Sequence, residues 1–213
     1  SGIIYTYNLT EEEISSEYTF AKAGDYEEIT TDGRYFFVLR SDGTIYSFPV
    51  DLKTGQDEVQ VFKGQLGKGE YESMSYDART KTLLVLCKSC KLDKGNPSVS
   101  GYLVNVHETG KLSLGETFQI NLDEVSAKGG KTLHSLKASS VTRRASTNEW
   151  YVLSSIDKLL LILNDSFQPL RVIRFEKEQF EQPEGITFDN NERMFISSEK
   201  NKLKNALLFQ FNK

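Results

Sequence analysis

Three glutamates and one serine stand at the same place in a six-residue pattern that recurs along the chain. Glu27, Glu72 and Glu184 each begin one copy, and Ser139 begins another. Carboxylates that converge from separate segments repel one another and are costly to desolvate. A hard cation such as Ca²⁺ relieves this cost, because it accepts oxygen ligands from a flexible set of side chains. The pattern therefore predicts a metal site at Glu27, Glu72 and Glu184, and Ser139 breaks its symmetry.

Two other interpretations of these four positions stay open. A glutamate at the start of a strand can accept hydrogen bonds from a neighbouring segment and bind nothing. The four positions can also line a small-molecule site together with polar residues that follow the next hydrophobic runs. Those residues are Arg40, Lys88, Ser154 and Glu199, with Ser198 and Asn201 extending the rim. Arg40 and Lys88 would then either neutralise the glutamates or hold an anionic ligand.

The sequence offers no constellation for nucleophilic catalysis. It contains no Gly-x-Ser-x-Gly motif, and its two histidines, His107 and His134, lie outside the recurring pattern. Cys87 and Cys90 form a Cys-x-x-Cys pair, which is compatible with two thiols, a local disulfide or half of a zinc site. A zinc site needs a second ligand pair, which the sequence lacks. We therefore favour a non-enzymatic role and name no catalytic residues.

The recurring pattern marks the first strand of a four-stranded unit. Its copies occupy residues 27–32, 72–77, 139–144 and 184–189, and both the first two and the last two start 45 positions apart. Short hydrophobic runs follow each copy, such as 35–39, 44–48 and 59–62 after the first. Four short strands in about 45 residues is the periodicity of a β-propeller blade. Residues 91–98 and 125–132, which lie between the second and third copies, are predicted to be loops.

The ends of the chain predict an incomplete ring. Residues 3–8 match a third strand and residues 18–20 a fourth strand, so the first blade lacks its first two strands. We expect a single all-β propeller domain over residues 1–213, five-bladed in the intact protein, with the missing strands upstream of Ser1. Strand edges would then stay exposed unless such a segment or a partner covers them. A six-bladed ring and a β-sandwich are the alternatives.

Composition and charge narrow the range of partners. The chain has 26 basic and 30 acidic residues, a net charge of −4, and no long basic block, so a nucleic-acid partner is not expected. The longest apolar run, 159–163, is far shorter than the roughly 18 residues that span a membrane. No transmembrane segment is expected in this chain.

Several runs together resemble the SdiA-regulated family of bacterial propeller proteins. They are residues 24–29, 35–46, 84–88, 182–189 and 195–201, which include the Asp-Tyr-Glu, Glu-Gly and Ser-Glu-x-Asn pieces. The resemblance covers nearly the whole chain. It implies a bacterial envelope location, periplasmic or associated with the outer membrane, and a lipid anchor upstream. It implies no defined reaction.

These observations favour a non-enzymatic binding or scaffold module of the bacterial envelope. The alternative is a calcium-dependent hydrolase, because lactonase propellers of the gluconolactonase type are similar in carrying a Glu-Gly near the start of an inner strand. The expected partners are a small molecule, a carbohydrate or an envelope protein. A carbohydrate would use exposed aromatics such as Tyr71 or Trp150, whereas Trp150 can instead pack between blades.

Overall fold

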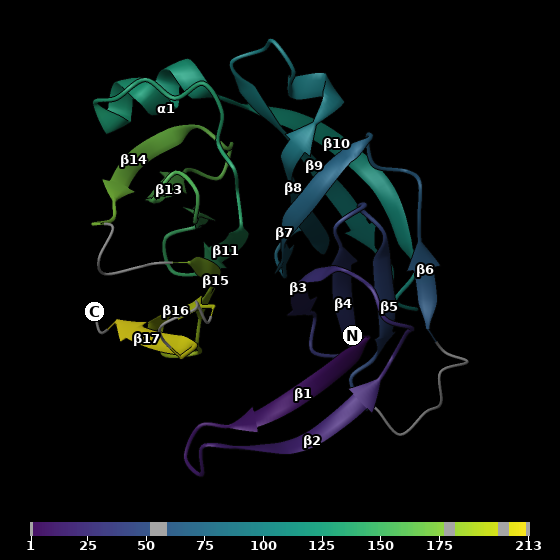
Figure 1. The fold of residues 1–213 in the computed structure, drawn as a ribbon. Helices are drawn as coiled ribbons and strands as arrows, with labels where there is room; N and C mark the ends of the chain where they lie inside the picture. The colour runs from purple at the N-terminus through teal and green to yellow at the C-terminus, as the bar shows by residue number, and fades with distance from the viewer. Residues whose placement is uncertain (1, 52–58, 177–181, 200–204, 212–213) are drawn as a thin grey trace.

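The computed structural model describes residues 2–51, 59–176, 182–199 and 205–211, and these residues form antiparallel sheets (Figure 1). Blade I contains β3 (Tyr26–Thr31), β4 (Tyr35–Arg40), β5 (Ile45–Pro49) and β6 (Gln60–Phe62). Blade II contains β7 (Gly69–Asp77), β8 (Thr82–Cys90), β9 (Ser98–Val106) and β10 (Leu112–Asn121). Blade III contains β11 (Ser140–Arg144), β12 (Glu149–Ser154), β13 (Leu159–Leu163) and β14 (Pro169–Arg174).

Two smaller sheets complete the described part of the chain. Blade IV has three strands, β15 (Pro183–Phe188), β16 (Met194–Ser198) and β17 (Leu207–Phe211). A hairpin of β1 (Ile3–Asn8) and β2 (Glu13–Thr19) lies next to blade I (Figure 1). The predicted all-β propeller is confirmed, with most strands near the predicted positions. The strand expected at residues 18–20 is longer and begins earlier, as β2 from Glu13 to Thr19. The five-bladed closure and the upstream strands stay predictions.

The strand that begins each blade lines a central channel. β3 lies against β7, β7 against β11, and β11 against β15. These four strands line a cavity of about 310 Å³ together with Phe195, Ser197 and Leu208 of blade IV. Hydroxyl groups join neighbouring inner strands, since Thr30 Oγ1 accepts from the Tyr76 amide at 3.2 Å and Ser140 Oγ accepts from the Ile186 amide at 3.2 Å.

The middle strands of blades II and III are apolar on both faces because each of these two blades packs between two others. Successive side chains of a strand point to opposite faces of the sheet. In β8, Leu83 and Val85 pack toward blade I, whereas Leu84 and Leu86 pack toward blade III. The side chains of β12 alternate in the same way, some packing toward blade II and the others toward blade IV. The uninterrupted hydrophobic runs of the sequence are therefore blades buried on both sides.

The loop prediction for residues 125–132 is wrong over most of its length. An α-helix, α1 (Leu122–Gly129), covers most of that stretch. Asn121 Oδ1 accepts from the amides of Asp123 and Glu124, which caps the helix N-terminus. Gly130 ends it in the left-handed conformation at φ 64°. The predicted loop at 91–98 contains one short 3₁₀ turn, Lys91–Asp93.

Candidate functional site

The three recurring glutamates all occupy β-bulges. The pairing of β3 with β4 shifts between Tyr26 and Glu28, which leaves Glu27 as the extra residue. The pairing of β7 with β8 shifts in the same way at Glu72, and the pairing of β15 with β16 shifts at Glu184. A bulge bends the strand and redirects the side chain of the extra residue. Each of the three glutamates thus coincides with a β-bulge at one end of an inner strand.

Four of the predicted site residues line one cavity of about 350 Å³ at this end of the channel. They are Glu72, Lys88, Ser139 and Glu184, and the polar lining also includes Lys137, Ser155, Lys158 and Gln182. We call this the channel-mouth cavity. Blade II contributes Glu72 and Lys88, blade III and the segment before it contribute Lys137, Ser139 and Ser155, and blade IV contributes Glu184.

Lys88 neutralises one of the glutamates in the channel-mouth cavity. Its Nζ forms an ion pair with Glu72 Oε1, and the two side chains are 19% and 14% exposed. Burial lowers the pKa of Lys88, but the hydrogen bond and charge of Glu72 outweigh it, so that the pKa is raised overall. Lys137 Nζ donates to the backbone carbonyl of Lys88 at 3.1 Å. Lys88 and Lys137 therefore both line the cavity that contains Glu72, and Lys88 pairs with it directly.

Glu184 is held by a neutral partner. The Ser155 side chain hydrogen-bonds its carboxylate. Burial raises the pKa of Glu184, the charges of Glu72 and Glu199 raise it further, and Ser155 and Lys88 oppose them without cancelling the rise. Glu184 thus holds a proton more readily than an ordinary glutamate.

Ser139 ties two blades together. Its buried hydroxyl accepts from the Ser155 amide at 3.1 Å and lies 3.3 Å from both the Leu153 and Pro183 carbonyl oxygens, to either of which it can donate. Pro183 belongs to blade IV, so the serine joins it to blade III. This is the structural role that the sequence left open for the glutamates.

Four other predicted rim residues that the structure describes, Arg40, Ser154, Ser198 and Glu199, lie outside the lining of the channel-mouth cavity. Arg40 pairs with Asp42 in the adjoining turn and donates to the Tyr46 hydroxyl at 3.2 Å. Glu199 is exposed and reaches Glu184 only through its charge. Asn201 lies outside the described residues. Ser154, which donates to Asp157 at 2.7 Å, is fully buried.

Glu27 lies beside the hairpin at the end of blade I. It lines a separate cavity of about 300 Å³ with Ile4 and Phe20. Burial and the charges of Asp25 and Glu72 raise the pKa of Glu27 to about 7. The predicted trio of glutamates is therefore divided between two cavities.

The glutamates do not form a preassembled cation cage. Among the described residues, only Cys87, Cys90 and Asp93 bring three metal-ligand atoms within 4.8 Å of one another. Cys87 and Cys90 form a disulfide, which settles the state of these cysteines and leaves no thiolate for a metal. Calcium at Glu27, Glu72 and Glu184 stays a prediction.

Two aromatic residues considered for carbohydrate binding are buried. Tyr71 is 0% exposed and Trp150 2% exposed. Tyr71 packs between blades I and II, and Trp150 packs between blades II and III. The expectation that they are exposed is wrong, and the interpretation of Trp150 as packing between blades is confirmed.

Glu28, which the sequence did not single out, crosses the channel. Its Oε2 accepts from Ser140 Oγ at 2.6 Å, which joins the inner strands of blades I and III across the inner strand of blade II. Burial raises the pKa of Glu28 to about 8, against weaker opposing hydrogen bonds from Ser140 and the Ile29 amide. Glu28 and Ser140 both occupy the second position of the recurring pattern. This shared position was the sequence feature that could have predicted their proximity.

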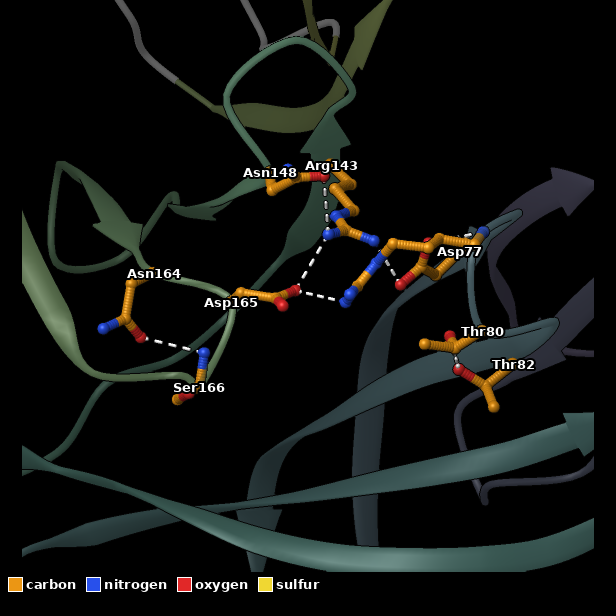
Figure 2. Close-up of polar contacts among 9 residues, drawn as sticks. Asp77, Thr80, Thr82, Arg143, Asn148, Asn164, Asp165 and Ser166 are labelled. Carbon is orange, nitrogen blue, oxygen red and sulfur yellow. Dashed lines mark hydrogen bonds and ion pairs between the residues drawn. The ribbon is translucent and has the colours of Figure 1, made fainter.

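Two adjacent arginines join blade III to both of its neighbours. Figure 2 shows Arg143 between Asp77 of blade II, with which it forms an ion pair, and Asp165, at 2.8 Å. Arg144 pairs with Glu192 of blade IV at 2.9 Å. In the other three copies an aspartate stands at the position of Arg144, so the third copy replaces a turn aspartate with a contact between blades.

The blades are arranged around a central channel, and the first strand of each blade lines that channel. This arrangement defines a β-propeller protein. No helix in the described residues has the length and apolar character that crossing a bilayer requires. The chain belongs to the SdiA-regulated family, whose model matches residues 13–205. No curated protein matches the chain.

Solved structures show the same fold at low sequence identity. Glutaminyl cyclase of Myxococcus xanthus is 14% identical with a TM-score of 0.57, and the match covers 98% of this chain and 80% of that one. A protein of unknown function from Bacteroides caccae is 12% identical with a TM-score of 0.54, over 100% and 69% of the two chains. Hydrazine synthase of Kuenenia stuttgartiensis is 11% identical with a TM-score of 0.54, over 90% and 47%. These similarities concern the fold alone.

Proposed function

We propose that the chain is a non-enzymatic binding module whose channel-mouth cavity binds a small polar molecule. The observation that carries this proposal is the convergence of three blades on one cavity of about 350 Å³, with Glu72, Lys88, Lys137 and Glu184 in its lining. A concave site with a few convergent polar groups is the usual form of a small-molecule site. Among the described residues, the cavity lining contains no histidine or cysteine that would activate a nucleophile.

The pattern of charges suggests the chemistry of the ligand. Lys88 and Lys137 provide donors, whereas Glu184 and the Ser155 hydroxyl provide acceptors. Since donors and acceptors lie in one cavity, a ligand with several hydroxyl groups, or with both an amino and an acidic group, matches it best. The ion pair of Lys88 with Glu72 gives the calcium-dependent alternative no support.

We place the module in the bacterial envelope. The Cys87–Cys90 disulfide supports this location, because disulfides persist in oxidising compartments and are rare in a reducing cytosol. Family membership supports a bacterial propeller protein. An upstream lipid anchor remains part of this proposal, and labelling of the full-length protein with a fatty-acid analogue in cells would test it.

The binding proposal is tested by ligand screening with matched variants. Polar metabolites would be screened by thermal shift, and hits would be measured by isothermal titration calorimetry. Glu184→Gln, inside the cavity, should weaken binding by roughly tenfold or more, because it removes a charged acceptor. Glu116→Gln removes an exposed carboxylate on β10 and should bind as the wild type does. Equal affinity of the two variants for every hit would show that the cavity is not the site.

A further inference from the structure

A second cavity, of about 270 Å³, lies on the other side of two lysines that line the channel mouth. Lys88 and Lys137 line both cavities. The rest of the second lining comes from the end of β8, the 91–98 loop, the start of β9 and the segment before β11. We call it the Ser98 cleft, after the serine at the start of β9.

The charged residues of the Ser98 cleft are mostly basic. Lys94 and Lys137 line it together with one acidic residue, Asp93, whereas the third lysine, Lys88, is paired with Glu72. Asp93 already accepts from Ser100, from its amide at 3.1 Å and from its hydroxyl at 2.6 Å. Lys137 Nζ donates to a neutral carbonyl, and neither Lys94 nor Lys137 has an ion-pair partner among the described residues. The cleft is thus locally cationic in a chain whose net charge is −4.

A buried hydroxyl in the cleft lining lacks a partner. Ser98 Oγ is buried and makes no hydrogen bond in the structure. Buried polar atoms without partners are rare and unfavourable, because they lose their bonds to water and gain none. A rotation of the Ser98 side chain toward the cleft would let this hydroxyl donate to a bound anion, which would also meet the ammonium groups of Lys94 and Lys137.

The cleft is built on a well-fixed loop. The Cys87–Cys90 disulfide closes the end of β8, and Asn96 Nδ2 donates to the Leu92 carbonyl at 2.9 Å. The Asp93 contacts with Ser100 attach the 3₁₀ turn to β9. A site whose groups are already positioned loses less entropy when a ligand binds.

We propose that the Ser98 cleft binds the anionic group of a small ligand, a phosphate or a carboxylate. Lys94 and Lys137 provide the charge, and Ser98 provides a directed hydrogen bond. This site is distinct from the channel-mouth site, because Ser98 and Lys94 do not line the channel-mouth cavity. The two proposals can therefore fail separately.

The test measures the binding of sodium phosphate and of sodium succinate by calorimetry and thermal shift, with ionic strength held constant by chloride. Lys94→Gln and Ser98→Ala should each weaken binding by roughly tenfold, because each removes a donor to a charged acceptor. Lys91→Gln is the matched control, since it removes an exposed lysine of the same loop that does not line the cleft, and it should bind as the wild type does.

Ser98→Ala has a second expected result that separates ligand binding from folding. Because the hydroxyl has no partner, its removal should not lower the melting temperature of the unliganded protein. Binding of phosphate alone identifies a phosphate site, and binding of succinate alone identifies a carboxylate site. If neither anion binds more tightly than chloride, or if Lys94→Gln and Ser98→Ala bind as Lys91→Gln does, the proposal is wrong.

Discussion

Lys88 in β8 forms an ion pair with Glu72, the bulged residue of the neighbouring strand β7. Both side chains are more than four-fifths buried, and the pair forms part of the wall between the channel-mouth cavity and the Ser98 cleft. The bulge redirects the Glu72 carboxylate into a partly closed cavity, and Lys88 provides its counter-charge there.

Removing Lys88 should leave Glu72 as an uncompensated, mostly buried charge. We expect Lys88→Met to lower the free energy of unfolding by about 2 kcal/mol, somewhat below the usual cost for fully buried pairs because both groups keep some solvent contact. Urea denaturation measures this change. The double variant Lys88→Met/Glu72→Gln should recover most of the loss. If the double variant is as unstable as the single one, packing of the lysine stem, and not its charge, stabilises the region.

Chelation tests the calcium site predicted from the sequence. Because Glu72 is paired with Lys88 and Glu27 lines another cavity, we expect EDTA to leave the melting temperature unchanged and added CaCl₂ to raise it no more than MgCl₂ does. Differential scanning calorimetry provides the measurement. A fall of several degrees in EDTA that Ca²⁺ alone reverses would instead favour the calcium-dependent alternative.

Stability should depend on pH through Glu28. Its pKa is about 8 in the folded protein, against the ordinary glutamate pKa of 4.5, so between these pH values the folded state binds more protons than the unfolded state. This contribution to stability is complete below about pH 4.5 and is lost as the pH rises through about 8. Glu28→Gln, which cannot titrate, should therefore show a flatter loss of stability over this range in urea titrations. Parallel profiles for the wild type and the variant would contradict the assignment.

Arg143 should stabilise the contact between blades II and III. Its side chain and that of Asp77 are 7% and 6% exposed, so Arg143→Met leaves a buried aspartate unpaired and should cost about 3 kcal/mol of stability. Arg79→Met is the matched control. Arg79 also pairs with Asp165, at 2.5 Å, but its side chain is 54% exposed, so we expect a loss below about 1 kcal/mol. Similar losses in the two variants would show that burial of the Asp77 pair is not the cause.

The sequence predicted most of the fold because the repeat fixes the strand order of every blade. It also predicted that Glu72, Ser139 and Glu184 lie close together, since equivalent residues of a repeat occupy equivalent positions around the channel. Arg40 was misplaced because a nearby aspartate, Asp42, holds its long side chain in the adjoining turn. Side-chain direction depends on local partners that a strand pattern does not reveal.

The remaining differences arise outside the repeat. Lys137 lies in the segment before β11, and Ser155 lies in the turn after β12, so neither belongs to the recurring pattern. The helix at Leu122–Gly129 occupies an insertion between blades, where its capping residue Asn121 was the available signal. Sequence periodicity is informative only where the chain repeats itself.

The two-sided packing of β8 and β12 has a consequence for how the molecule unfolds. Since each of these strands gives alternate side chains to two different cores, neither blade II nor blade III has a core of its own. If either of these blades unfolds, both of its neighbours lose the apolar contacts that they make with it. We expect all-or-none denaturation across blades I to IV, with fluorescence, circular dichroism and calorimetry reporting coincident midpoints.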